Sequence, residues 1–479
     1  MTGGAGRPER ALALLAALLI ISAGAGCGAA GSKNTAAEPE ATAAESLPVV
    51  EVTDGDTGRP LADAEVVARD GRARTRLTTG PDGRVAVPSG TDSIRAGGAG
   101  VNPDTALIGV EGSDGLSARA TVYRSSIQSP VYGGTPQRTR HLRHVVAPRP
   151  DGPPDWRLDA GSLVEFPPAV RNGLAVLGTN RGRIIAVDAF TGERRWTRRA
   201  RAPIASSPAI SGGRAFVTSM DGFLTAYSTG GGKELWRFPT DGPTESSPLI
   251  FADLIVFGDT GGTLRAVRAT TGELVWSHRA AGAIKSAAAR AGELAIVGDY
   301  GGQVQAVNLR TGVPAWTWTG GKRFYGGPAV AQGIVVIGDV GGYVLALDAR
   351  TGAERWRREK GAFVYASPAI ADGRVYIGSF TGDLEALRLT DGRPVWSTPV
   401  GGRIGGSATV VGDVVYSSVL ARDNEPRRTI AAAVADGRVV WESEAGRYSP
   451  AVAAGHSLFL VDVRTVSAWH GPAAGRGPS

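Results

Sequence analysis

The chain has 479 residues, of which 69 are glycine and only 6% are aromatic, and its formal net charge is +7. No run of five or more basic residues occurs, so the charge is spread along the sequence and does not form a nucleic-acid-binding stripe. The single cysteine excludes an intramolecular disulfide, a thiol pair and a cysteine-rich zinc site. Short Val/Ile/Leu runs between glycine-containing turns predict an all-β protein.

The first 27 residues have the pattern of an export signal. Arg7 and Arg10 precede an apolar stretch at 11–21, and a run of small residues follows it and ends in Cys27. This order is typical of signal peptides, and the apolar stretch is short for a membrane span. The A-G-C sequence that ends at Cys27 resembles the cleavage site of bacterial lipoprotein signals. The resemblance implies a lipid on Cys27 and an extracytoplasmic location at the membrane. Ordinary secretion is the alternative.

Two different regions follow the signal. Residues 28–46 have no apolar face, so we expect a disordered tether. Residues 47–127 alternate apolar and polar positions between tight turns, which predicts short strands. The pattern V-x-D-x-x-T-G-x-P-L-x-D-A-x-V, which begins at Val52, resembles the small β-sandwich modules of the carboxypeptidase-regulatory or transthyretin-like kind. The resemblance implies a small β-sandwich at 47–127 that serves as a spacer or adhesion unit.

A linker rich in proline, arginine and histidine is expected at 128–154. His141 and His144 have a spacing that can bring two side chains to one metal ion on a helix. No carboxylate or thiol accompanies them, and the surrounding residues do not favour a helix. We therefore predict no metal site in the linker.

Eight tryptophans stand at nearly regular intervals through residues 155–471. Six of the seven steps between them are 40 residues and the last is 45, and such a period indicates a repeat architecture. Each interval holds four short apolar segments, which predicts four strands and therefore one blade of a β-propeller. We expect the indole rings to pack between neighbouring sheets. The eight residues are Trp156, Trp196, Trp236, Trp276, Trp316, Trp356, Trp396 and Trp441.

The two ends of the repeat region predict a closed ring. The last copy supplies three strands and ends before a tryptophan strand, whereas the strand of Trp156 has no blade before it. Closing the ring removes the exposed sheet edges that an open array would present. We therefore predict an eight-bladed propeller in which the N-terminal strand completes the last blade, followed by a disordered tail at 472–479.

The motif around the tryptophans resembles that of a known family. A-x-D-x-x-T-G-x-x-x-W is intact at 186–196 and at 346–356 and is similar to the tryptophan-docking motif of quinoprotein-type, or PQQ-binding-like, propellers. The resemblance covers roughly 155–471. Tyr132-Gly133-Gly134 with Arg138 resembles the lead-in segment that precedes the first blade in this family.

The resemblance implies one of two functions. Some members are enzymes that hold pyrroloquinoline quinone and a calcium ion, and others are cofactor-free propellers that bind proteins. The enzymes need a carboxylate base, calcium ligands and frequently a vicinal cysteine pair, and this chain has only one cysteine. Blades of 40 residues also leave little sequence for a cofactor chamber. We expect no catalytic residue, no metal and no cofactor, with a quinone-dependent dehydrogenase as the alternative.

Strand order places one variable residue of each blade at the mouth of the central channel. These residues stand three positions before the recurring proline, and variation inside a repeating framework is what a binding rim predicts. Unconstrained solvent loops would vary in the same way. An insertion at 421–428 adds a charged loop to this face. The candidate mouth residues are Glu165, Glu245, Lys285, Tyr325, Tyr365 and Arg447, and the candidate partner contacts in the loop are Arg422, Arg427 and Arg428.

Three aspartates, Asp259, Asp299 and Asp339, end successive strands on the same face. They either form an acidic arc for a cation or each cap their own Gly-Gly turn, which is the usual role of such residues. The leading hypothesis is a monomeric, non-enzymatic, lipid-anchored scaffold that binds another envelope or secreted protein and no nucleic acid. A glycan or wall-polymer binder with Tyr325 and Tyr365 at its mouth is a further alternative.

Overall fold

The computed structural model describes residues 47–471 except 57, 99–100, 103, 108–114, 126–127, 143–149, 151, 421–427 and 445–450. Its named elements are all β-strands, so the predicted all-β class is confirmed. Within this part of the chain, no helix is long and apolar enough to span a membrane. The expected signal peptide with Cys27, the tether and the C-terminal tail lie outside the described residues.

Two sheets form the N-terminal part of the described chain. In the first, β1 (Val49–Asp54) pairs with β9 (Ala118–Arg124), β5 (Arg84–Ala86) and β2 (Arg59–Pro60), and β7 (Val101–Asn102) pairs with β9. The second has the order β4 (Ala73–Thr78), β3 (Glu65–Asp70), β6 (Ser93–Gly97) and β8 (Asp104–Leu107). Val50, Val52 and Val66 belong to one buried core that both sheets share. The period-two alternation in β1 and β3 therefore directs the apolar faces of both sheets inward.

Six further sheets each consist of four consecutive antiparallel strands. Their bounds are β12 (Ala169–Arg171), β13 (Leu174–Gly178), β14 (Arg183–Asp188) and β15 (Arg194–Arg199); β16 (Ala209–Ser211), β17 (Arg214–Ser219), β18 (Phe223–Ser228) and β19 (Glu234–Pro239); β20 (Leu249–Phe251), β21 (Leu254–Gly258), β22 (Thr263–Arg268) and β23 (Leu274–Arg279); β24 (Ala289–Ala291), β25 (Leu294–Gly298), β26 (Gln303–Asn308) and β27 (Pro314–Thr319); β28 (Ala329–Ala331), β29 (Ile334–Gly338), β30 (Tyr343–Asp348) and β31 (Glu354–Glu359); β32 (Ala369–Ala371), β33 (Arg374–Gly378), β34 (Asp383–Arg388) and β35 (Pro394–Pro399).

Two more sheets join strands from distant parts of the chain. With the sheet of β12–β15 counted as the first, the seventh has the order β10 (His141–Leu142), β37 (Thr409–Val411), β38 (Val414–Leu420), β39 (Arg428–Ala433) and β40 (Val439–Ser443). In this sheet β36 (Arg403–Ile404) also pairs with β38. The eighth has the order β11 (Trp156–Asp159), β43 (Thr465–His470), β42 (Ser457–Val461) and β41 (Val452–Ala454). In β11, Trp156 stands opposite Ala468, as Trp196 stands opposite Ala186 in the first sheet.

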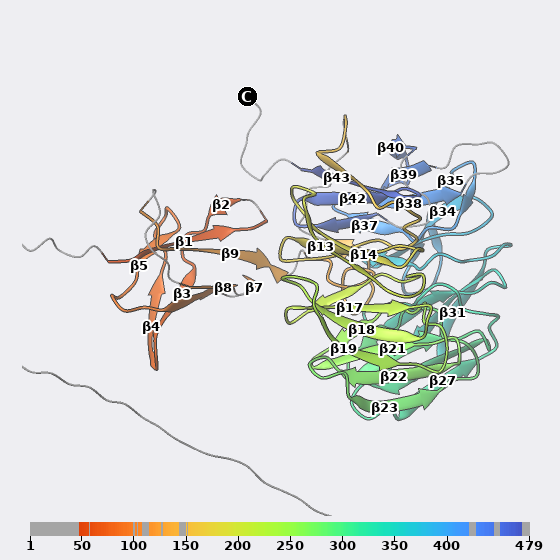
Figure 1. Ribbon diagram of the computed structural model, residues 1–479. Helices are drawn as coiled ribbons and strands as arrows, with labels where there is room; N and C mark the ends of the chain where they lie inside the picture. The colour runs from red at the N-terminus through yellow and green to blue at the C-terminus, as the bar shows by residue number, and fades with distance from the viewer. Residues whose placement is uncertain are drawn as a thin grey trace, which may run out of the picture. The chain divides into compact units, whose positions relative to one another are not determined.

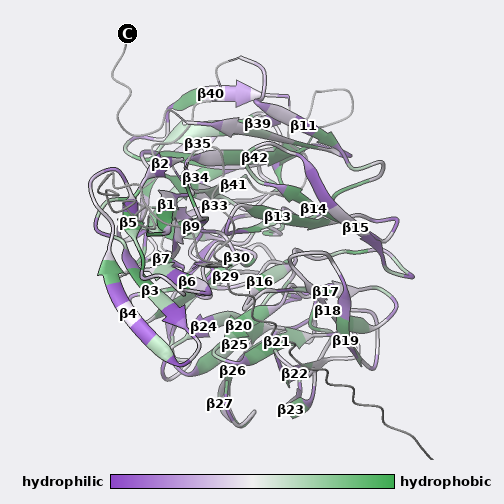
Figure 2. Cartoon of the chain, turned by 60° about the vertical axis from the view of Figure 1, so that its left-hand side comes forward, coloured by the Kyte–Doolittle hydropathy of each residue, from purple (hydrophilic) through white to green (hydrophobic). Residues whose placement is uncertain are grey.

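Burial follows the position of each strand in its sheet. The second and third strands are buried almost throughout, as in β21, because neighbouring sheets cover both of their faces. The fourth strand is exposed except at its tryptophan, as in β15, where Trp196 alone is buried. Figure 2 shows this contrast between the apolar β13 and the polar β15. The first and eighth sheets share a core that includes Trp156, Val170 and Phe459, and β42 and β43 lie near β13 and β14 in Figure 1.

Residues 129–142, part of the segment expected to be a linker, run along the first strands of the sheets. Backbone carbonyls in this segment accept hydrogen bonds from backbone N–H groups of five different sheets. The acceptor and donor pairs are Pro130 with Ile210, Pro136 with Arg290, Gln137 with Val330, Thr139 with Ile370 and Arg140 with Val410. The segment therefore satisfies N–H groups on inner strands that would otherwise lack a partner.

Candidate functional site

One residue in most connections between sheets is partly exposed and stands between two buried neighbours. Glu245 lies between Thr244 and Ser246, and Lys285 occupies the equivalent place 40 residues later. The first strands of several neighbouring sheets lie side by side, for example β12 beside β16 and β24 beside β28. The predicted mouth residues Glu165, Glu245, Lys285, Tyr325 and Tyr365 line a single cavity, together with Tyr132, Phe166 and Gly405.

The cavity at the mouth is small, with a volume of about 100 Å³. A water molecule takes about 30 Å³ in the liquid, so the cavity holds a few waters or the end of one side chain. Pockets for cofactors and other small molecules usually measure about 300–1,000 Å³. This mouth therefore does not fit a quinone cofactor of several fused rings.

An ion pair joins two consecutive connections at the mouth. Lys285 Nζ lies 2.7 Å from Glu245 Oε1, and the two side chains are 28% and 18% exposed. Burial and the nearby Glu245 carboxylate raise the pKa of Glu165, while Lys285 opposes the shift. Two carboxylates and one ammonium group thus line the same partly desolvated space, where charge interactions are stronger than in water.

Aromatic side chains border the cavity on one side. The aromatic rim consists of Tyr300, Tyr325, Phe363, Tyr365 and Phe380. The Tyr325 and Tyr365 rings are 4.8 Å apart at 83°, and those of Tyr365 and Phe380 are 4.9 Å apart at 41°. Phe363 is 49% exposed and Tyr325 is 37% exposed. Burial is the main cause that raises the pKa of Tyr325, and it raises that of Tyr300 to about 12. Both phenols therefore remain protonated hydrogen-bond donors at neutral pH.

The structure describes only one of the other predicted contacts. Arg422, Arg427 and Arg447 fall outside the described residues. Arg428 begins β39, donates a hydrogen bond to the Val400 carbonyl and lies 3.6 Å from Glu442. It is not among the residues that line the mouth cavity. Three members of the aromatic rim, Tyr300, Phe363 and Phe380, were not predicted from the sequence.

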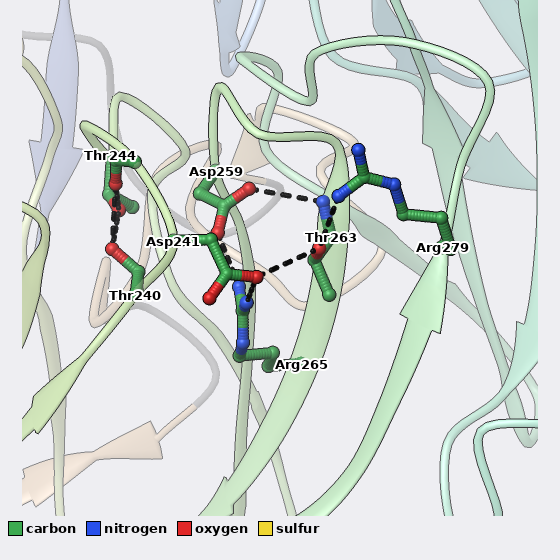
Figure 3. Close-up of polar contacts among 8 residues, drawn as sticks. Thr240, Asp241, Thr244, Asp259, Thr263, Arg265 and Arg279 are labelled. Carbon is green, nitrogen blue, oxygen red and sulfur yellow. Dashed lines mark hydrogen bonds and ion pairs between the residues drawn. The ribbon is translucent and has the colours of Figure 1, made fainter.

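The three aspartates on this face bind backbone groups of their own turns. Asp259 accepts a hydrogen bond from the Thr263 backbone N–H at 3.0 Å and also pairs with Arg265, which in turn pairs with Asp241 (Figure 3). In the equivalent turns, Asp299 accepts from Gln303 at 3.0 Å and Asp339 accepts from Tyr343 at 2.9 Å. This geometry is that of a turn cap. Across the described ranges, no group of three His, Cys, Asp or Glu residues could hold a metal ion.

The antiparallel sheets and their tryptophan contacts define a protein with PQQ-like β-propeller repeats. A protein-family model described as outer membrane protein assembly factor BamB matches residues 143–300, 300–387 and 367–471, which is more than half of the chain. The chain belongs to this family.

The matches to individual proteins are either short or low in sequence identity. Outer membrane protein assembly factor BamB of Burkholderia pseudomallei is 43% identical over 53 residues, which is 11% of this chain and 14% of that protein. The crystal structure of BamB from Moraxella catarrhalis has a TM-score of 0.57 at 17% identity and covers 68% of this chain and 98% of that one. Quinohemoprotein alcohol dehydrogenase from Comamonas testosteroni has a TM-score of 0.62 at 15% identity, covering 74% and 82%. At these identities the two solved structures establish the fold alone.

Proposed function

We propose that this chain is a non-enzymatic scaffold outside the cytoplasm, in which an eight-bladed propeller binds another envelope protein at its channel mouth. The pairing of β11 with β43 and the core shared by the first and eighth sheets support a closed ring. Membership of a family described as an outer membrane protein assembly factor supports a partner among envelope proteins.

The observation that carries this proposal is the form of the mouth. Its cavity of about 100 Å³ is too small for a cofactor, but the aromatic rim beside it leaves Phe363 and Tyr325 exposed. Aromatic residues are enriched where proteins bind one another, and exposed apolar groups gathered at one place mark interaction sites. A binding surface therefore explains both features better than a catalytic chamber does.

In the same proposal, the parts of the chain before the propeller anchor it and hold it at a distance from the membrane. Cys27 carries the lipid anchor, residues 28–46 form a tether, and the two sheets at 47–127 act as a small β-sandwich spacer. The propeller occupies 155–471 and acts as a monomer. Replacement of Cys27 by serine should release the protein from the membrane fraction, whereas retention there would contradict lipidation.

In-cell photo-crosslinking tests the proposed binding face. A photoreactive amino acid at position 325 should give a discrete adduct with an envelope protein. The control is position 274, where Leu274 is 51% exposed on the outer strand β23. Equal labelling from both positions, or none from 325, would contradict a specific face.

The alternatives have distinct outcomes. Addition of pyrroloquinoline quinone and calcium with dye-linked alcohol oxidation should give no turnover, and turnover would overturn the scaffold proposal. Retention on insoluble wall polymer that disappears when Tyr325 and Tyr365 are replaced by alanine would identify a glycan-binding module instead.

A further inference from the structure

The outer side of one N-terminal sheet carries four exposed arginines. In the sheet that contains β4, β3 and β6, residues such as Val66 and Ile94 belong to the buried core. Successive residues of a strand project from opposite faces, so the residues between these core positions face away from the core. Figure 2 shows the hydrophilic segments of β4 on this sheet. The arginines that define the basic face are Arg69, Arg74, Arg76 and Arg95.

The register of the strands gathers these side chains in two neighbouring rows. Arg69 stands directly opposite Arg74, and in the next row Val67 stands between Arg76 and Arg95. Residues directly opposite each other have Cβ atoms about 4.5–5.5 Å apart, and like charges in this position destabilise a sheet. The pair of Arg69 and Arg74 therefore costs the fold stability, as groups kept for binding commonly do.

The acidic groups beside the basic face form only weak or local contacts. Arg76 Nε lies 3.8 Å from Glu65 Oε1, and the two side chains are 83% and 51% exposed, so this is a weak surface pair. Asp92 accepts hydrogen bonds from the Ser93 hydroxyl at 2.8 Å and from the Gly71 backbone N–H at 3.3 Å. The turn between β3 and β4 adds one residue of each charge, Asp70 and Arg72.

Another arginine-rich strand, β15, differs from the basic face. It carries four arginines, but Arg195 pairs with Asp188 at 2.7 Å and Arg198 donates hydrogen bonds to the carbonyls of Gly231 and Gly232. It is also the last strand of its sheet, where charged side chains prevent pairing with other chains. The basic face extends over β3 and β6, which are inner strands and need no such protection. Protection of a sheet edge therefore does not explain the basic face.

We propose that the basic face binds the anionic lipid headgroups of the membrane to which Cys27 anchors the chain. In the proposed function only residues 28–46 separate the lipid from the sheets, and a flexible chain of that length spans roughly 25 Å. The tether therefore keeps the basic face within reach of the membrane surface. Phosphate groups accept paired hydrogen bonds from arginine, and a lipid together with a basic patch gives stable membrane attachment. This inference rests on the proposed anchor but not on partner binding at the mouth.

Vesicle cosedimentation tests the proposal on the mature chain, residues 27–479, in which Cys27→Ser removes the lipid. The vesicles contain phosphatidylcholine alone or with about one-third phosphatidylglycerol. We expect at least tenfold tighter binding to the anionic vesicles at low ionic strength. This preference should disappear at about 1 M salt, where the Debye length falls to about 3 Å. Equal binding to both kinds of vesicle, or to neither, would overturn the proposal.

A pair of double variants locates the binding surface. Arg74→Gln with Arg76→Gln removes two exposed charges from β4 and should weaken binding to the anionic vesicles at least fivefold. The matched control is Arg194→Gln with Arg199→Gln, which removes the same charge from two exposed positions of β15 and should leave binding nearly unchanged. Equal losses in the two double variants would show that the overall charge of the chain, and not the basic face, attracts the vesicles.

Glu65→Gln keeps the test independent of folding defects. It removes the acid that pairs with Arg76 and should tighten binding to the anionic vesicles at least twofold, which a loss of structure cannot do. Unchanged or weaker binding would contradict the proposed role of the basic face. Stronger retention on insoluble wall polymer than on the vesicles would overturn the choice of a membrane.

The outcome for the basic face can be separated from that for the mouth. The crosslink from position 325 should persist in the Arg74→Gln and Arg76→Gln variant. If the vesicles are not bound while this crosslink forms, the membrane inference fails and partner binding at the mouth stands. If the vesicles are bound but no crosslink forms, partner binding fails and the membrane inference stands.

Discussion

The indole nitrogen of Trp276 donates a hydrogen bond to the carbonyl oxygen of Leu309 at 2.9 Å, and this bond joins the sheet of β20–β23 to the sheet of β24–β27. The same contact, over the same sequence separation of 33 residues, links Trp196 to Thr229 and Trp356 to Leu389. For Trp396 the separation is 38 residues, because the five-residue insertion lies between the tryptophan and its acceptor, Val434. The regular spacing of the tryptophans in the sequence thus reflects a contact that each sheet makes with the next.

Truncation of one such tryptophan should therefore weaken the contact between two neighbouring sheets. Trp276→Ala removes a buried indole and should lower the free energy of unfolding by about 3–5 kcal/mol. Trp276→Phe keeps part of the volume but leaves the Leu309 carbonyl without its donor, at a cost of about 1–3 kcal/mol. Chemical denaturation measures both effects. Trp318, which is only partly buried and lies outside the tryptophan period, is the control. A Trp318→Phe effect as large as that of Trp276→Phe would contradict the special role of the docking position.

Arg138 should hold the 129–142 segment against the sheets. Its side chain is 2% exposed and donates hydrogen bonds from Nε to the Ala288 carbonyl and from Nη2 to the Pro248 carbonyl, both at 3.0 Å. Arg138→Met leaves these acceptors unpaired, so we expect a loss of at least about 2 kcal/mol of stability. The backbone amide of Arg290, which donates to Pro136 in the segment, should also exchange faster with deuterium.

The matched control for this prediction is Arg268→Met. Arg268 forms an exposed ion pair with Asp253 at 2.7 Å, and such pairs contribute about 1 kcal/mol or less. Similar losses in the two variants, with no change in exchange at Arg290, would show that the segment does not brace the blades.

Glu165→Gln should stabilise the protein at neutral pH. The folded pKa of Glu165 lies above its ordinary value of 4.5, so the folded chain binds this proton more tightly than the unfolded chain does. The stabilisation that protonation provides is complete below about pH 4.5 and is lost as the pH rises through the raised folded pKa. Glutamine remains neutral, so the variant should melt at a higher temperature than the wild type at neutral pH, and the difference should vanish in acid.

Thermal melts between acidic and neutral pH check this expectation, with Glu273→Gln as the exposed control. A Glu165→Gln variant that is less stable than the wild type at neutral pH would show that the carboxylate supports the fold. A stabilising replacement would instead agree with a residue kept for binding, because binding sites commonly sacrifice stability.

The 40-residue period of the sequence predicted those parts of the fold and of the site that recur from one repeat to the next. The 40-residue step placed Glu245 and Lys285 at equivalent positions, and the structure joins them in an ion pair at the mouth. The contacts of residues 129–142 could not be predicted in the same way. Most of them are backbone-to-backbone hydrogen bonds, which leave little signal in the choice of side chains.

The aromatic rim was missed for a different reason. Phe363 stands two positions before Tyr365, and Phe380 lies in the next turn between strands, so neither occupies the repeating mouth position. Their approach to Tyr365 depends on the directions of side chains in two separate loops, with ring centroids 5.9 Å and 4.9 Å away. Sequence spacing alone does not fix these directions.

The most direct test of partner binding at the mouth combines crosslinking with removal of the rim. A photoreactive residue at position 205 replaces a small side chain, Ala205, at the equivalent mouth position of another connection. We predict that in cells it forms one discrete adduct with an envelope protein, and that this adduct is lost when Tyr325 and Phe363 are both replaced by alanine in a chain that still folds. An adduct that persists at full yield without the two aromatic side chains would contradict the account.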